Sequence, residues 1–298
     1  MELWASGFNA WGQLEFSRGN GLDSKDLKVF KRVLEDKQIE ILRTSLSATL
    51  IRTSKGLISA GSPDDLICLC LSKQDSFPHL AMAGNDQLIE STPTHLKNYA
   101  SLQDFQSKNS KDLGLPEELQ QIVANQTTFT ALSKEGGRVY TWGDGRYPNC
   151  LGREVSSNCP AQVPSLVEDL VELPGGSIRK ISSGGYVTAA LTDDNDLYIW
   201  GGRAGQKAIL EGLEGSSTPV DVDDEDVWDV SVGVNHIIAV TLDRKLFVVG
   251  EGANGQLGLD VKNLNEWKEV KLPLGEGQRI MSVHAGYKSS FVLVQNVT

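Results

Sequence analysis

Ile181–Gly184 reads ISSG and is followed by TAALT (Thr188–Thr192), the polar turn DDND (Asp193–Asp196) and LYIWG (Leu197–Gly201). Apolar and small residues on both sides of a short polar turn are typical of two paired antiparallel strands. Further copies of this pattern run from Val230 to Gly250, from Ile122 to Gly143 and from Ile41 to Gly61. A hairpin that recurs along the chain predicts an all-β repeat fold.

The last copy of the repeat lacks its final segment. Val283–Tyr287 and Ser290–Val294 match the first two segments, but the sequence ends before a third. At the other end, Leu3–Gly7 reads LWASG and has the form of the missing segment. An array completed in this way closes into a ring and leaves no edge strand exposed. We therefore predict a closed β-propeller whose last blade is completed by the N-terminal strand.

The glycines that end the third segment of each repeat indicate the number of blades. They are Gly7, Gly61, Gly143, Gly201 and Gly250. The interval of 82 residues from Gly61 to Gly143 is too long for one repeat. Within it, Leu80–Leu88 resembles another opening strand, and Leu66–Leu71 would supply an inner strand. We expect five full blades and one abbreviated blade, with seven blades as the alternative.

Composition and charge exclude several classes of function. The chain has 39 acidic and 28 basic residues and a formal net charge of −11, so we expect no direct binding to nucleic acid or to anionic membranes. No apolar run approaches the ~18 residues of a membrane helix, and the N-terminus lacks the pattern of a secretory signal. No segment has the composition of a linker, so we expect a single domain over residues 1–298, degenerate between 61 and 121.

The cysteines indicate a reducing compartment rather than a metal site. Cys68 and Cys70 are two residues apart in a predicted strand and are expected to be core thiols, while Cys150 and Cys159 are too far apart for a zinc-binding pair. We therefore expect no metal, and a location in the cytoplasm, the nucleus or both.

No motif for catalysis or cofactor binding is recognisable. Gly250–Gly255 fits Gly-x-Gly-x-x-Gly, but the residues after it lack the helical pattern that a dinucleotide site requires. The histidines are scattered, and His236 is expected to be buried and bonded to the backbone. We therefore predict a protein that is not an enzyme and needs no cofactor.

Two loops carry a resemblance to a known family. Gly7–Leu14 reads GFNAWGQL and Gly250–Gly258 reads GEGANGQLG. With the strands before them, they resemble the Trp-Gly … Asn … Gly-Gln-Leu-Gly signature of the regulator of chromosome condensation repeat family, and Gly233–His236 matches its Gly-x-x-His segment. The layout is similar to the small stand-alone members. The resemblance implies a β-propeller that serves as an interaction platform, and one member of the family is the guanine nucleotide exchange factor for the small GTPase Ran.

Tryptophans fall into two groups with different expected roles. Trp142 and Trp200 share one slot of the repeat, Trp4 lies near it, and all three are expected to pack between blades. Trp11, Trp228 and Trp267 lie outside this slot. Trp11 and Trp267 are expected to lie in loops. Aromatic residues in loops are common at the centres of protein interfaces, so these two are candidates for binding a partner, although they can equally cover a core.

An acidic run precedes one of these tryptophans. Asp221–Asp229 reads DVDDEDVWD and lacks the Gly and Glu that an EF-hand calcium loop requires at its sixth and twelfth places. The run is either a solvated loop or a contact for a basic partner, and the candidate residues in the second case are Asp223, Asp224, Glu225, Asp226 and Trp228.

These observations leave three hypotheses for function. The leading one is a non-enzymatic scaffold, monomeric by itself, that binds a partner protein with a basic surface through its propeller loops. The alternatives are guanine nucleotide exchange on a small GTPase and binding of histones, whose basic surface an acidic platform would complement.

Overall fold

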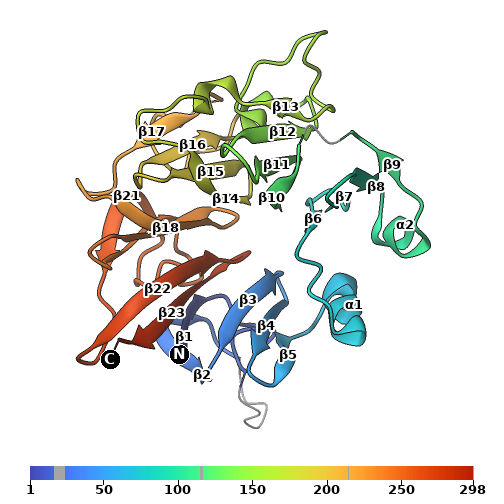
Figure 1. The fold of residues 1–298 in the computed structure, drawn as a ribbon. Coiled ribbons are helices and arrows are strands. Elements are labelled where there is room, and N and C mark those ends of the chain that lie inside the picture. Colours follow the sequence, from blue (N-terminus) through green and yellow to red (C-terminus); the bar gives the residue numbers. More distant parts are fainter. Residues whose placement is uncertain (17–23, 115–116, 214, 298) are drawn as a thin grey trace. The chain divides into compact units, whose positions relative to one another are not determined.

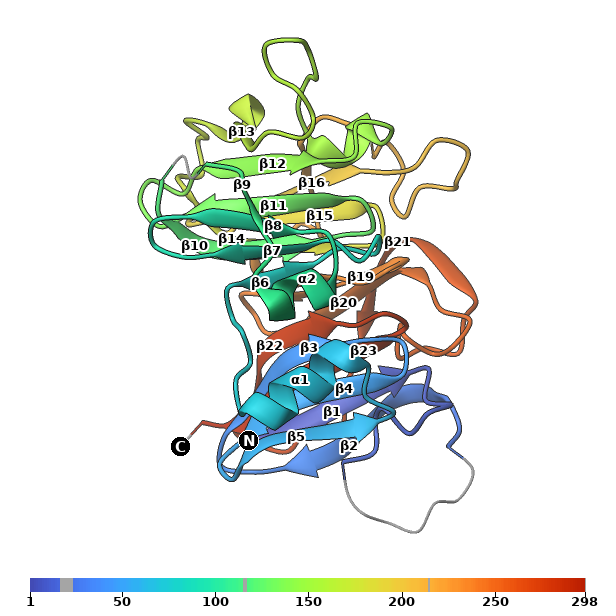
Figure 2. The same ribbon diagram turned by 90° about the vertical axis from the view of Figure 1, so that its right-hand side faces the viewer.

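Figures 1 and 2 show the computed structural model of the chain, which describes residues 1–16, 24–114, 117–213 and 215–297. Across these ranges the strands form six antiparallel sheets. The chain divides into two units with three sheets each: unit 1 comprises Met1–Pro78 and Val222–Thr298, and unit 2 comprises His79–Asp221. Each sheet is one blade. The prediction of six blades is therefore confirmed over the described ranges, and the alternative of seven is wrong there.

One blade of unit 1 joins the two ends of the chain. In hydrogen-bonded order its strands are β2 (Leu27–Glu35), β1 (Glu2–Gly7), β23 (Ser289–Asn296) and β22 (Gln278–Ala285). β1 pairs with β23 along its whole length, and the side chains of Leu3 and Ala5 are fully buried, because alternate residues of a strand face the same side. The prediction that the N-terminal strand completes the last blade is confirmed (Figure 1).

The other two blades of unit 1 contain inner strands that are buried on both faces. They consist of β3 (Ile39–Thr44), β4 (Ala48–Thr53) and β5 (Gly56–Gly61), and of β18 (Val227–Val232), β19 (His236–Thr241), β20 (Leu246–Glu251) and β21 (Asn263–Val270). Every residue of β19 is buried. Its Ile238 and Val240 pack in one cluster with Val283 and Val292 of the neighbouring blade. Burial on both faces explains why β19 reads as an almost continuous apolar run.

Unit 2 contains three four-stranded blades. They are β6 (Leu80–Met82), β7 (Leu88–Ser91), β8 (Leu96–Tyr99) and β9 (Lys111–Asp112); β10 (Leu119–Ala124), β11 (Thr128–Ser133), β12 (Val139–Gly143) and β13 (Ser165–Leu166); and β14 (Ile178–Gly184), β15 (Val187–Thr192), β16 (Leu197–Gly201) and β17 (Thr218–Val220). Trp142 on β12 belongs to one core cluster with Ile89 of the preceding blade, and Trp200 on β16 belongs to one core cluster with Leu132 of the preceding blade. The prediction that these two tryptophans pack between blades is confirmed.

The segment Leu66–Leu71 is helical, so its prediction as an inner strand was wrong. Helix α1 (Asp65–Lys73) begins where the Asp64 side chain accepts a hydrogen bond from the Ile67 backbone N–H at 2.9 Å. An acidic residue at the N-cap and a basic residue in the last turn both stabilise a helix, and in α1 these residues are Asp64 and Lys73. The blade predicted to be abbreviated is complete without this segment, because β6–β9 form it, whereas the blade of β3–β5 has three strands among the described residues.

The helix also changes the interpretation of two cysteines. Residues two apart on a strand share a face, but on a helix they point about 200° apart. Cys70 is buried, as expected, but Cys68 is exposed, so the prediction of two core thiols was wrong for Cys68. All four cysteines of the chain are free thiols.

The remaining helical segments are short. Helix α2 (Leu102–Ser107) and the 3-10 turns η1 (Pro148–Leu151) and η2 (Glu168–Leu170) lie in unit 2. Among the residues that the structure describes, no helix has the length and apolar character needed to cross a bilayer.

The strand-ending glycines have a common physical cause. Gly201 has a φ of +125°, and a Cβ placed on it would lie 2.2 Å from the Tyr186 carbonyl oxygen of the adjacent hairpin turn. Gly250 has a φ of +109°, and its Cβ would lie 2.4 Å from the Asn235 oxygen. Only glycine combines this conformation with so close an approach to backbone. The glycines that indicate the repeat therefore mark the point where each third strand leaves its blade.

His236 joins two of the repeat's motifs in unit 1. It is fully buried, as predicted, and its Nε2 lies 2.9 Å from the Ser290 hydroxyl. That hydroxyl donates to the Gln256 carbonyl oxygen at 2.7 Å, so the imidazole N–H donates to Ser290. Two consecutive hydrogen bonds through the hydroxyl of Ser290 on β23 thus connect the Gly-x-x-His segment to the Gly-Gln-Leu loop.

Candidate partner-binding surface

The acidic run forms a tight turn at the start of β18. Val222 and Glu225 bridge its two sides, and Asp223 and Asp224 occupy its centre with φ values of 60° and 59°. Two successive residues in the left-handed region are the geometry of a type I′ turn, which Asp tolerates better than most residues. Asp223, Asp224 and Asp226 are exposed, whereas Glu225 is half-buried. We call residues 223–226 the acidic turn.

The acidic turn packs beside the turn between β19 and β20. Glu225 forms an ion pair with Lys245, and its carboxylate raises the pKa of that amine. The Leu242 backbone N–H donates to the Asp226 carbonyl oxygen at 2.9 Å. The turn is thus held by the Val222–Glu225 bridge and by the contacts of Glu225 and Asp226, and Asp223, Asp224 and Asp226 are exposed.

Trp228 is held in place by two interactions. Its indole N–H donates to the Met281 carbonyl oxygen at 3.0 Å, and the Arg244 guanidinium lies 4.0 Å from the ring centroid. The side chain is half-buried and belongs to the seam between β18 and β22. This geometry supports the structural alternative for Trp228.

The last aspartate of the run is structural, which sequence reasoning missed. The buried Asp229 carboxylate accepts from the Val230 N–H at 3.0 Å and from the Val283 N–H of β22 at 2.9 Å. In unit 2 the corresponding third residue of β10, Gln121, bonds both the N–H and the C=O of Ile181 at 3.0 and 2.8 Å. The signal in the sequence is a polar residue at the third place of an innermost strand.

A polar pocket adjoins the acidic turn. It has a volume of about 510 Å³, and its lining includes Asp243, Arg244, Gln278 and Arg279. Arg244 and Arg279 line this pocket, and Lys245, which follows Arg244, pairs with Glu225 of the acidic turn. This end of unit 1 therefore carries charges of both signs, and its exposed acidic side chains include the three aspartates of the acidic turn and Asp243.

The other two candidate tryptophans lie elsewhere on unit 1. Trp11 is 55% exposed in the loop after β1, where its backbone N–H donates to the Gln13 side chain at 3.0 Å. Trp267 lies on the strand β21 and is half-buried, so its interpretation as a loop residue was wrong.

The strand directions show which candidates lie together. β18 and β22 run parallel, because Asp229 bonds Val283 and Ser231 bonds Ala285 two residues further along. β1 has the direction of β22, since both pair antiparallel with β23. The acidic turn precedes β18 and Trp11 follows β1, so they lie at opposite ends of the blades. The acidic turn and Trp228 form one surface, which Trp11 does not join.

The described residues hold no cluster of three or more His, Cys, Asp or Glu side chains that could bind a metal ion. Of the glycines in Gly250–Gly255, Gly250 lies at the end of β20 and Gly252 and Gly255 lie in the loop after it, and no helix follows them in the described chain.

Comparison with known proteins identifies the type of repeat. The model of the Regulator of chromosome condensation (RCC1) repeat matches residues 136–191. Human Regulator of chromosome condensation is 35% identical over 150 residues, which cover 49% of this chain and 34% of that protein. The Arabidopsis thaliana ultraviolet-B receptor UVR8 is 30% identical over 208 residues, which cover 51% of this chain and 47% of the receptor. The matched segments thus span less than half the length of these relatives.

Solved structures extend the likeness to the full chain. Prp20p from Saccharomyces cerevisiae is similar over 100% of this chain and 92% of its own, with a TM-score of 0.70 and 13% identity. Human WBSCR16 is similar over 99% of this chain and 100% of its own, with a TM-score of 0.63 and 14% identity. At these identities the likeness shows the fold, a β-propeller.

Proposed function

Because this chain is an RCC1-repeat β-propeller, we propose that it is a non-enzymatic module that binds a partner protein with a basic surface at its acidic turn. The observation that carries the proposal is the exposure of Asp223, Asp224 and Asp226 on a turn that is held by the Val222–Glu225 bridge and by the hydrogen bond from Leu242 to Asp226. A fixed turn presents its charges without a large cost in conformational entropy. Charges at the rim of an interface act mainly on the rate of association.

One relative supports a basic partner. The structure of yeast Prp20p was reported together with its binding to Gsp1p and histones. Histones carry a strongly basic surface, which an acidic turn complements. We further propose that the protein is a monomer by itself and resides in the cytoplasm, the nucleus or both, which its four free thiols support.

The test uses a charge-neutral variant with a matched control. Asp223→Asn, Asp224→Asn and Asp226→Asn remove three charges and leave the ion pair between Glu225 and Lys245 intact. The control, Glu168→Gln, Asp169→Asn and Glu172→Gln, makes the same change in net charge at exposed positions of unit 2. Association with purified histone H3–H4 is measured by surface plasmon resonance at 50 and 300 mM salt.

We expect the triple variant to associate about tenfold more slowly at 50 mM salt and the difference to shrink at 300 mM, because salt screens exposed charges. Equal slowing in the control would assign the effect to net charge alone. Unchanged association of the triple variant would overturn the acidic turn as the site, and the next candidate would be the loop of Trp11.

A second candidate function is guanine nucleotide exchange. It is favoured by the identity with human Regulator of chromosome condensation and by the reported binding of Gsp1p to Prp20p. An exchange factor acts by stabilising the nucleotide-free GTPase, so it needs no catalytic side chain. Release of a fluorescent GDP analogue from a panel of small GTPases decides between the two. No acceleration supports the binding module, and a large acceleration with one GTPase establishes the second function.

A further inference from the structure

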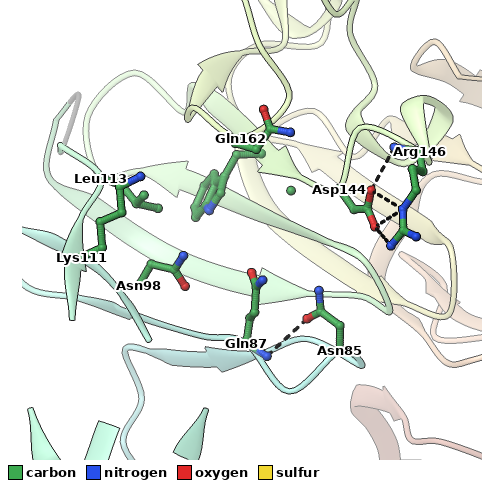
Figure 3. Close-up of a pocket in the computed structure, with 10 residues that line it drawn as sticks. Asn85, Gln87, Asn98, Lys111, Leu113, Asp144, Arg146 and Gln162 are labelled. Atoms are coloured by element: carbon green, nitrogen blue, oxygen red, sulfur yellow. Dashed lines mark hydrogen bonds and ion pairs between the residues drawn. The ribbon is translucent and has the colours of Figure 1, made fainter. Parts of the chain in front are cut away.

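A second pocket lies in unit 2, between the blade of β6–β9 and the blade of β10–β13. Its volume is about 390 Å³, which is within the usual range of ligand sites. Four of the side chains that line it are carboxamides: Asn85, Gln87, Asn98 and Gln162. Figure 3 shows Asn98 and Gln87 extending from one wall toward the wall that carries Gln162. Both walls therefore present groups that can donate and accept hydrogen bonds.

Two buried polar atoms of this pocket have no hydrogen-bond partner among the described residues. They are the indole nitrogen of Trp142 and the side-chain oxygen of Asn98. Trp142 is only 3% exposed, and its ring stacks on Phe129 at 5.7 Å between centroids, which fixes its orientation. An indole N–H only donates and an amide oxygen only accepts. Buried polar atoms are nearly always paired in folded proteins, so the two atoms call for a ligand that offers one acceptor and one donor.

The pocket is also positively charged within an acidic chain. Asp144 binds Arg146 with Oδ2 at 2.6 Å from Nη2, and this hydrogen bond lowers the pKa of the carboxyl group. The positive charge of Arg146 is thus neutralised by Asp144, whereas Lys111 on β9 adds a positive charge at the other side of the pocket. The ligand that this arrangement favours is neutral or acidic.

The surface next to the pocket has the composition of a protein interface. Tyr147 stacks on Tyr186 at 5.5 Å, and the Arg203 guanidinium lies 5.9 and 5.3 Å from the two ring centroids. Arg146, which lines the pocket, lies 6.0 Å from the Tyr147 ring and connects the two features. Tyrosine and arginine are enriched among residues that dominate binding energy. A ligand longer than the pocket would continue onto this surface.

We propose that this pocket binds an extended peptide segment of a partner protein that places an acidic side chain near Lys111. Each peptide unit offers one C=O and one N–H. The C=O can accept from the indole N–H of Trp142, and the N–H can donate to the side-chain oxygen of Asn98. The chain already uses a carboxamide in this way, because Gln121 bonds both backbone groups of Ile181. The site is separate from the acidic turn of unit 1 and selects a partner of the opposite charge.

The probe is a phage-displayed library of random heptapeptides, selected against the full chain. A selected peptide is then synthesised with a fluorophore, and its affinity is measured by fluorescence polarisation. Three variants test the site. Trp142→Phe removes the N–H and keeps the stacked ring, Lys111→Glu reverses the charge, and Gln162→Ala changes an exposed wall of the pocket. Lys37→Glu, at an exposed position of unit 1, is the control for charge.

We expect selected peptides to contain acidic residues and to bind Trp142→Phe and Lys111→Glu at least tenfold more weakly, with no change for Lys37→Glu. Thermal unfolding of each variant confirms that it folds; if Trp142→Phe does not, Lys111→Glu and Gln162→Ala decide. Failure to enrich any peptide, or equal affinity for all variants, would overturn the proposal. An oligosaccharide array is probed in parallel. If only oligosaccharide binding depends on Trp142, the ligand of the pocket is a sugar and the peptide proposal is overturned.

Discussion

Protonation of the buried His236 is expected to make the stability of the fold depend on pH. Burial lowers the pKa of this imidazole from 6.5 to about 4, and the neutral ring donates to the Ser290 hydroxyl. Between these two pH values the unfolded chain binds a proton that the folded chain does not. Stability is therefore fully present above pH 6.5 and falls as the pH falls toward 4. Linkage gives a loss of about 2 kcal/mol between pH 7 and pH 5.

The assay compares urea unfolding of the wild type and His236→Gln at pH 7 and pH 5. Glutamine retains an N–H donor for Ser290 but does not titrate, so its free energy of unfolding lacks this contribution. We expect the wild type to lose about 2 kcal/mol more than the variant between the two pH values. His79→Gln, at an exposed position, is the control and should follow the wild type. An identical pH dependence for wild type and His236→Gln would refute the burial and the neutral state of the imidazole.

Two further predictions concern the blades. Deletion of Met1–Gly7 removes β1 from between β2 and β23, together with the buried side chains of Leu3 and Ala5. We expect a loss of stability comparable to the total stability of a domain, about 5–15 kcal/mol, which would be visible as loss of the cooperative thermal transition. A melting temperature within about two degrees of that of the full chain would contradict the pairing. Gly201→Ala should destabilise by about 3 kcal/mol or more in urea unfolding, because its Cβ would meet the Tyr186 oxygen at 2.2 Å. Gly205 also has a positive φ, +79°, but has open space around the Cβ position, so Gly205→Ala is the control for backbone strain alone. A smaller loss of stability in Gly205→Ala than in Gly201→Ala isolates the cost of the clash.

The fold was largely predictable because its repeat has a strict backbone requirement. The glycines that end the third strands, such as Gly201 and Gly250, adopt positive φ against a neighbouring backbone, so no other residue replaces them without strain. The helix α1 was not predicted from its apolar run, because Leu66–Leu71 suits a buried strand as well as a helix. The decisive signal was the capping residue Asp64, just after Pro63, together with the burial of Leu66, Ile67 and Cys70 at helical spacing.

The candidate surface was predictable only in part. The density of acidic residues before β18 located the acidic turn, but sequence alone did not show that Glu225 pairs with Lys245 or that Asp229 bonds the backbone of β22. These roles depend on strands that are distant in the sequence. The pocket of Trp142 was missed for the same reason, since its carboxamides come from several loops and strands and form no motif.

The two proposed sites differ in how salt should affect association. The net charge of −11 attracts a basic partner over long distances, so salt slows its approach to the acidic turn. An acidic peptide is repelled by the same long-range field and attracted only locally by Lys111. The Debye length falls from about 10 Å at 0.1 M to about 3 Å at 1 M, so moderate salt screens the long-range repulsion before the local attraction. Association of the peptide should therefore be insensitive to moderate salt or faster in it. Opposite salt dependences for the two ligands would establish that unit 1 and unit 2 bind different partners.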